Sequence, residues 1–159
     1  MQIRIVDTDG SKIEDAAPGS VGEVWTRSDQ NMLGYWNNPD ATAATLTPDG
    51  WLRTGDAGYV DAGGYLYLHD RLKDMIVSGG ENVYPAEVEN VLMTHPGVAD
   101  VAVIGIPDSR WGEAVKAVVV TAPDAGPTEA ELITFARDRL GGFKLPKSCL
   151  LYTSDAADE

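Results

Sequence analysis

The sequence predicts an α+β protein in two parts, a β-rich first half followed by a small α+β domain. Two observations support this prediction. Turn signals separate short strand-like segments throughout residues 1–70, which is typical of antiparallel strands. From residue 75 onward, a helical pattern, two continuous apolar runs and a second helical pattern follow one another, which predicts helix, strand, strand and helix.

The first segments of the β-rich half are two strands and a short helix. Residues 2–7 and 23–27 have strand character, and Asp9–Gly10 is a hairpin turn signal after the first of them. A short helix is expected over residues 41–46. Its candidate caps are Asp40 and Thr42, because both side chains can accept a hydrogen bond from the first helical turn.

A strand, a turn and a hairpin complete the first half. Residues 51–53 are expected to form a strand that ends in a turn at residues 54–56. Residues 59–60 and 65–68 flank the glycine-rich segment 61–64, which by spacing and turn chemistry predicts a hairpin.

The second half opens with an amphipathic helix. Apolar residues at helical spacing predict this helix over residues 85–94, with Pro85 at its start. His95 follows it and is interpreted as a helix-terminal or surface residue rather than a catalytic base. The continuous apolar runs 98–106 and 114–121 then predict two strands joined by a hairpin loop.

A capping box predicts the start of the second helix. Thr128 and Glu131 have the spacing in which each side chain bonds the backbone of the other residue. Leu132, Phe135, Ala136 and Leu140 give this helix its inward face, and Gly141–Gly142 is expected to end it.

The composition excludes several classes of function. A formal net charge of −13 argues against a nucleic-acid surface, which needs clustered Lys and Arg. The single cysteine, Cys149, excludes an internal disulfide framework and fits a reducing compartment. No apolar run reaches the roughly 18 residues that span a bilayer, and no secretory signal is visible. A cytoplasmic protein is therefore expected.

The segment 70–89 resembles the hinge-and-glycine motif of acyl-CoA synthetases in the adenylate-forming superfamily, especially the fatty-acyl and aryl-acid branches. Taken alone, its adjacent glycines Gly79 and Gly80 favour a tight hairpin turn between two short strands. The resemblance extends over residues 2–147. It implies that residues 1–70 are the β-rich end of the large AMP-binding domain and that 71–147 are its small, mobile C-terminal domain. Residues 148–159 fit neither the family pattern nor a core pattern and are interpreted as an atypical tail that is not native.

The resemblance also implies nucleotide-binding and hinge residues. Thr54–Gly55–Asp56 matches a family motif whose aspartate holds the ribose hydroxyls of ATP, whereas an isolated Asp56 after glycine would be interpreted as a turn residue. Arg71 corresponds to an arginine that contacts the nucleotide. Lys73 falls at the hinge about which the small domain rotates between the two half-reactions, and its simpler interpretation is a solvated charge.

The remaining matches imply contacts with coenzyme A. Ser78, Gly79 and Gly80 flank the pantetheine in the family, and Trp111 falls where an aryl-acid relative packs a tryptophan on the thiol arm. Taken alone, Trp111 would be interpreted as a packing residue. The segment 143–147 matches one that meets the nucleotide end of coenzyme A, which assigns Phe143, Lys144 and Lys147 to this site. Leu145 departs from relatives that carry arginine there, so it is not assigned to phosphate.

The intact protein is therefore expected to be a ligase. With ATP and Mg²⁺ it would convert a carboxylic acid, favoured to be a fatty acid, to an acyl adenylate and then transfer the acyl group to coenzyme A. The family's phosphate loop, acyl pocket and magnesium ligand are expected upstream of Met1, and no adenylation lysine follows Lys147. No catalytic residue or metal ligand is therefore assigned, and the chain alone is expected to be inactive.

Partners and alternatives follow from the same interpretation. The expected partners are the carboxylic acid, ATP, coenzyme A and the upstream domain of the same chain, with no nucleic acid and no membrane span. One alternative is a binding or interaction module without catalytic activity. The other is an adenylation domain of a peptide synthetase, which passes its acyl group to a carrier protein.

Overall fold

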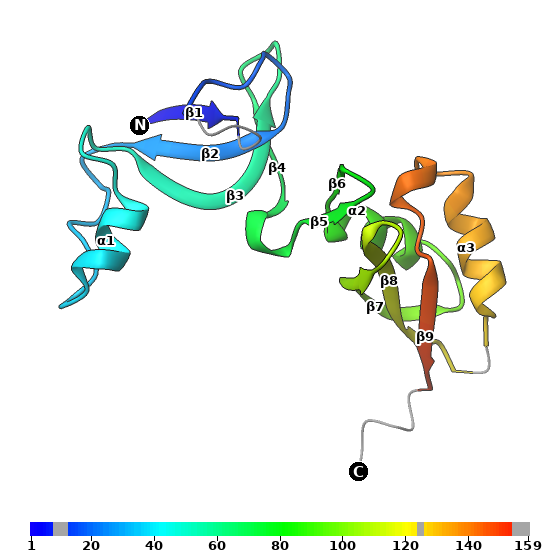
Figure 1. Ribbon diagram of the computed structural model, residues 1–159. Helices are drawn as coiled ribbons and strands as arrows, with labels where there is room; N and C mark the ends of the chain where they lie inside the picture. Colours follow the sequence, from blue (N-terminus) through cyan, green and yellow to red (C-terminus); the bar gives the residue numbers. More distant parts are fainter. Residues whose placement is uncertain (8–12, 124–125, 154–159) are drawn as a thin grey trace. The chain divides into compact units, whose positions relative to one another are not determined.

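The computed structural model describes residues 1–7, 13–123 and 126–153, and the chain divides into two compact units. Unit 1 is Met1–Lys73 and unit 2 is Asp74–Glu159, and each has a sheet of its own (Figure 1). In the described ranges, no helix is both long enough and apolar enough to cross a membrane. The Asp9–Gly10 turn signal lies outside the described residues.

Unit 1 is a four-stranded antiparallel sheet whose strands follow one another in sequence order, as the turn signals predicted. Its core is small, because Val6, Val24, Trp25 and Ala57 are its buried apolar side chains in the described ranges. The elements are β1 (Gln2–Val6), β2 (Gly22–Arg27), α1 (Pro39–Thr45), β3 (Leu52–Val60) and β4 (Leu66–Arg71).

Helix α1 begins at a residue that the sequence analysis did not choose. Asn38 is its N-cap, and the Asn38 side chain accepts a hydrogen bond from the Ala41 amide at 3.1 Å. Pro39 then occupies the first helical turn, where its missing N–H costs nothing. The expected caps Asp40 and Thr42 are therefore wrong, since both residues already lie inside the helix.

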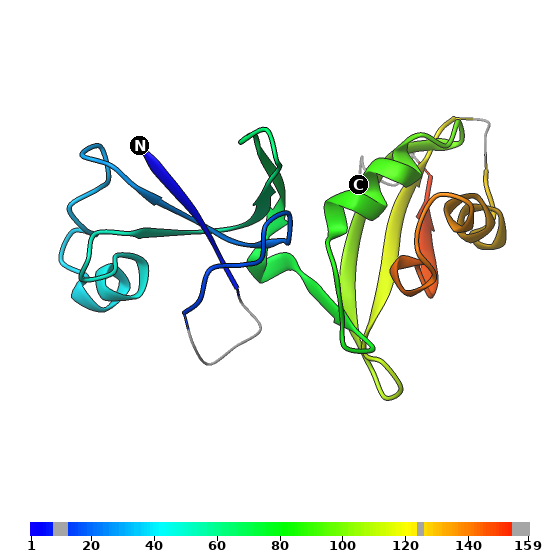
Figure 2. The ribbon, with the colours of Figure 1, turned by 90° about the horizontal axis from the view of Figure 1, so that it is seen from above.

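Unit 2 packs two helices against a mostly antiparallel sheet. Its sheet order is β6-β5-β8-β7, and β9 pairs with β8 as the one parallel addition among the described strands. Helix α2 contacts β7, helix α3 contacts β9, and the two helices contact each other (Figure 2, where α3 is orange and β9 red). The elements are β5 (Ile76–Ser78), β6 (Glu81–Val83), α2 (Pro85–Met93), β7 (Val98–Asp108), β8 (Gly112–Thr121), α3 (Glu129–Arg137) and β9 (Ser148–Tyr152).

One hydrophobic core lies between the helices and the sheet of unit 2. Helix α2 contributes Val88 and Leu92, both fully buried, and helix α3 contributes Leu132 and Ala136. These are positions that the helical periodicity predicted to face inward. The strands complete the cluster with Ile76, Val83, Val98, Val103, Val115, Ala117 and Val119.

The predicted capping box of α3 is confirmed, but the predicted end of the helix is wrong. Thr128 and Glu131 each bond the backbone of the other residue, as predicted. The helix ends at Arg137 rather than at Gly141–Gly142, and the turn after it tightens, since the Arg139 amide donates to the Ala136 carbonyl three residues earlier at 3.0 Å. Leu140 nevertheless reaches the core and is 9% exposed.

Residues 148–152, which the sequence analysis included in an atypical tail, form a strand of the unit 2 sheet. They form β9, which pairs with β8 in parallel from Lys116↔Ser148 to Val120↔Tyr152. Such pairing uses backbone groups and requires no apolar pattern. In agreement with the missing pattern, the side chains of Leu150, Leu151 and Tyr152 are exposed. Residues 154–159 lie outside the described ranges.

Candidate functional site

The two residues predicted to bind the nucleotide are brought together in unit 1. Asp56 on β3 lies opposite Arg71 on β4, and Arg71 Nε is 3.2 Å from Asp56 Oδ1. The side chains are 32% and 62% exposed respectively, so solvent screens the pair and it contributes little to stability. The partly exposed carboxylate and the exposed guanidinium are instead available to a ligand.

Asp56 belongs to an irregular stretch of strand rather than to a turn after a strand, which corrects the expectation for residues 54–56. Gly55 adopts a φ of +74° inside β3, a conformation that other residues rarely adopt. The Asp56 amide donates to Thr54 Oγ1 at 3.1 Å, and the Thr54 hydroxyl donates to the Val24 carbonyl at 2.7 Å. The motif is thus tied to β2.

Glu23 on β2 is a residue of this site that sequence reasoning missed. Its Oε1 accepts from the Gly55 amide at 3.2 Å, and its Oε2 accepts from Trp25 Nε1 at 2.7 Å. Glu23 and Gly55 are 32 positions apart in the sequence. No local pattern signals such a contact, because it depends on the pairing of β2 with β3.

Lys73 lies at the boundary between the two units. It is the middle residue of a short 3₁₀ helix, Leu72–Asp74, and unit 1 ends at Lys73 itself. This boundary is three residues beyond the one expected after residue 70. The role of Lys73 as a pivot stays a prediction.

The residues predicted to flank pantetheine form a compact group in unit 2. Gly79 and Gly80, with φ of +62° and +85°, form the two-residue turn between β5 and β6 that the glycines alone favoured. Ser78 is buried and pairs with Gly112, and the Gly79 amide donates to the Trp111 carbonyl at 2.8 Å. A Cβ on Gly79 would lie 2.9 Å from Trp111 Cε3, so only glycine admits the ring at this distance.

Two cations lie near the Trp111 ring. The Arg110 guanidinium carbon is 4.8 Å from the ring centroid and Lys147 Nζ is 5.2 Å from it, distances at which cation–π attraction operates. The Asp108 carboxylate accepts from the Arg110 and Trp111 amides and so fixes the loop. Sequence reasoning included Trp111 and Lys147 and missed Arg110 and Asp108.

Lys144 has a partner that the sequence did not predict. Its Nζ lies 2.7 Å from both carboxylate oxygens of Glu87, in the first turn of α2. Phe143 is 40% exposed on the same short 3₁₀ helix, Gly142–Lys144. Leu145 packs partly against the core, which accounts for an apolar residue at this position. Lys147 thus lies over the Trp111 ring, whereas Lys144 forms an ion pair with Glu87.

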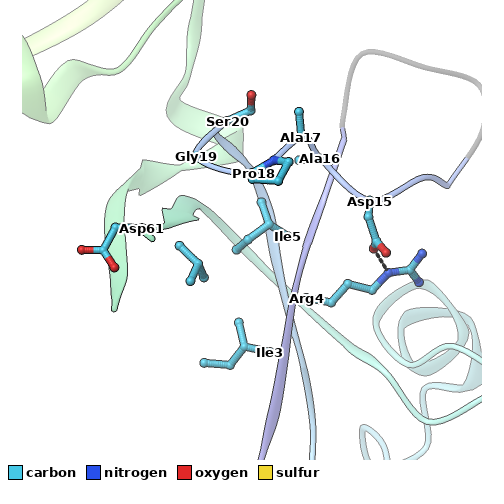
Figure 3. A pocket seen from close by; sticks show the side chains of 11 residues that line it. Ile3, Arg4, Ile5, Asp15, Ala16, Ala17, Pro18, Gly19, Ser20 and Asp61 are labelled. Atoms are coloured by element: carbon cyan, nitrogen blue, oxygen red, sulfur yellow. Dashed lines mark hydrogen bonds and ion pairs between the residues drawn. The ribbon is translucent and has the colours of Figure 1, made fainter. Parts of the chain in front are cut away.

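The described residues suggest no metal centre at these groups. In those ranges, no three His, Cys, Asp or Glu side chains are placed to hold a metal ion. Unit 1 has an open hollow of about 390 Å³, whose lining includes the ion pair of Arg4 and Asp15 (Figure 3). None of the predicted site residues lines it.

Comparison with known proteins identifies unit 2. The family described as the AMP-binding enzyme C-terminal domain matches residues 87–155. Unit 2 contains an AMP-binding enzyme C-terminal domain. The resemblance found in the sequence and the α+β fold class are thereby confirmed.

Relatives of this AMP-binding enzyme domain are ligases. The chain is 52% identical to a fatty acid–[acyl-carrier-protein] ligase of Streptomyces coeruleorubidus, over 90% of the chain and 27% of that protein. It is 51% identical to a long-chain-fatty-acid–CoA ligase of Mycobacterium tuberculosis, over 81% of the chain and 25% of that protein. The o-succinylbenzoate coenzyme A synthetase of Bacillus subtilis, solved with ATP and a magnesium ion, matches 95% of the chain and 30% of its own length, with a TM-score of 0.83 and 38% identity. The chain therefore spans about a quarter of the length of these curated relatives.

Proposed function

We propose that this chain is part of an AMP-forming acid–thiol ligase that activates a carboxylic acid with ATP and transfers the acyl group to coenzyme A. The observation that carries this proposal is the pair of Asp56 and Arg71, a partly exposed carboxylate beside an exposed guanidinium on two adjacent strands. The ligases among the relatives and the ATP-bound neighbour support it. The names of the two curated relatives favour a fatty acid as the substrate class.

Each residue of the pair has a chemical role in nucleotide binding. The Asp56 carboxylate has two oxygens that can accept from the adjacent hydroxyls of a ribose, and charged acceptors form the stronger hydrogen bonds. The Arg71 guanidinium is a permanently charged donor suited to phosphate or another acceptor of the nucleotide. In the described ranges no three His, Cys, Asp or Glu side chains gather to hold a metal ion, so we assign Mg²⁺ no ligand in this chain and derive no step through it.

We propose that the residues around Trp111 bind coenzyme A, the acceptor of the acyl group. The turn at Gly79 and Gly80 presents backbone without side chains beside an aromatic ring, which suits a narrow pantetheine arm. Lys147 and Arg110 supply positive charge close to it. Glu87 neutralises Lys144, so we propose that Lys147 meets the phosphates of coenzyme A more directly. In the overall reaction the carboxylate attacks the α-phosphate of ATP and releases pyrophosphate, which gives the acyl adenylate. The thiol then attacks the acyl carbon and displaces AMP.

Replacing Asp56 by alanine tests the nucleotide assignment. The experiment uses a chimera of the Mycobacterium tuberculosis ligase in which the aligned 129 residues of this chain replace their counterparts. Asp56→Ala should raise the KM for ATP in pyrophosphate exchange, because losing a charged acceptor costs about 1.5–3 kcal/mol of binding. Asp61→Ala is the matched control, since Asp61 is a turn carboxylate of the same unit that bonds only backbone amides in the described contacts. Unchanged ATP kinetics in Asp56→Ala would refute the ribose assignment.

A second substitution tests the proposed pivot. Lys73→Pro fixes φ near one value, so we expect it to impair one half-reaction of the chimera more than the other. Lys73→Ala removes the charge and leaves the backbone free, and should affect both half-reactions little. Pyrophosphate exchange measures adenylate formation, and thioester synthesis from supplied acyl adenylate measures the second step. Equal loss of both activities in Lys73→Pro would indicate misfolding and count against a pivot.

A further inference from the structure

The Glu23 carboxylate connects a buried ring to the motif that carries Asp56. One oxygen accepts from the indole N–H of Trp25, which is 3% exposed, and the other accepts from the Gly55 amide. Arg53 lies over the Trp25 ring, with its guanidinium carbon 5.0 Å from the centroid. The indole N–H thus fixes the position of the carboxylate, which then presents its second oxygen to β3.

The pairing of β2 with β3 explains why β3 needs this contact. Glu23 pairs with Ala57 and Trp25 pairs with Arg53, with a register shift between the two pairs. On the β2 side, residues 54–56 therefore lie opposite Val24 alone, outside the regular ladder between β2 and β3. Irregularities of this kind redirect a side chain but leave backbone groups without ladder partners. Two side chains make hydrogen bonds in place of the missing backbone pairs. Glu23 accepts from the Gly55 amide, and the Thr54 hydroxyl donates to the Val24 carbonyl and accepts from the Asp56 amide.

We infer that Glu23 is a positioning residue for Asp56, acting through the backbone of Gly55. Its carboxylate holds Gly55 at a φ of +74° and thereby sets the direction in which Asp56 leaves the strand. This inference rests on the proposed function, in which Asp56 binds the ribose of ATP. Glu23 itself makes no contact with the nucleotide in this mechanism.

Glutamine at position 23 separates this role from simple packing. A glutamine side chain has one acceptor oxygen and one NH₂ donor, whereas both partners of Glu23 are N–H donors. It can satisfy one partner and must turn a donor toward the other. Removing the indole N–H as well, with Trp25→Phe, leaves Gly55 as the only donor, which the glutamine oxygen can accept.

The kinetic test uses three variants of the chimera. Glu23→Gln should raise the KM for ATP about tenfold and leave kcat near the parent value, because the lost contact affects nucleotide binding in the ground state and the transition state alike. Trp25→Phe alone should raise the KM for ATP less than Glu23→Gln does, because the Glu23 carboxylate keeps its bond to the Gly55 amide. The double variant Glu23→Gln/Trp25→Phe should return the KM for ATP toward the parent value, an effect that a purely structural role does not produce.

A structural readout on the 159-residue chain makes the test independent of activity. Hydrogen exchange at the Gly55 amide should accelerate in Glu23→Gln and recover in the double variant. An unchanged Gly55 exchange rate, a KM effect of Trp25→Phe equal to that of Glu23→Gln, or no recovery in the double variant would overturn the inference. If Asp56→Ala leaves the KM for ATP unchanged, the proposed function fails instead, whatever Glu23 does.

Discussion

Replacing Leu92 by alanine should lower the free energy of unfolding of unit 2 by about 2–5 kcal/mol. Leu92 is fully buried on the inner face of α2, within the single cluster that joins both helices to the sheet. The truncation removes the transfer free energy of the lost atoms and leaves a cavity that close-packed neighbours fill only in part. No polar group is involved, so the effect should be insensitive to salt.

Met93→Ala is the control for this substitution. Met93 is the next residue of the same helix and is 45% exposed, so its truncation should change the free energy of unfolding little. Urea unfolding of the 159-residue chain measures the free energy of unfolding of both variants. Hydrogen exchange of amides in β7 and β8 serves as the probe, so that the measurement reports on unit 2. Equal destabilisation by Leu92→Ala and Met93→Ala would contradict the assignment of Leu92 to the core.

Alanine at Gly79 should destabilise unit 2 much more than alanine at Gly80. Both residues have positive φ, so both substitutions incur the left-handed strain of about 1–2 kcal/mol. At Gly80 the added Cβ meets no atom within 4 Å, whereas at Gly79 it lies 2.9 Å from the Trp111 ring. Displacing that ring should add about 1–3 kcal/mol, as overpacking does elsewhere. The difference between the two variants in urea unfolding isolates the contact from the backbone strain.

Removing the ring provides the control for Gly79→Ala. In a Trp111→Ala background the added methyl meets no indole, so Gly79→Ala should then cost no more than Gly80→Ala does. A double-mutant cycle measures this interaction free energy. Additive effects of Gly79→Ala and Trp111→Ala would show that the ring does not restrict Gly79 to glycine.

The elements that periodicity predicted are those with one buried face. The spacing of Val88 and Leu92 predicted α2, and the capping box at Thr128 predicted the start of α3, because both signals are local in sequence. The apolar runs likewise predicted β7 and β8. Local signals failed at ends, as where α3 stops at Arg137 and its last turn tightens.

The candidate site could be predicted only in part. Family resemblance singled out Asp56, Arg71 and Trp111, and the structure brings the first two together and places the third against Gly79. Family resemblance did not assign a role to Glu23, because its contact with Gly55 arises from a register shift between β2 and β3. Glu87 was missed for a similar reason, since its partner Lys144 is 57 positions away.

Strand β8 also determines the order in which the sheet of unit 2 can assemble. One edge of β8 pairs with β7 along its whole length, and only residues 109–111 connect the two strands. Its other edge is shared between β5, which meets it at Gly112, and β9, which pairs with it from Lys116 to Val120. Closing the short connection loses little chain entropy, whereas β5 and β9 must return from opposite ends of the unit. We therefore expect the β7–β8 hairpin to form early and β5 and β9 to dock on its other edge afterwards.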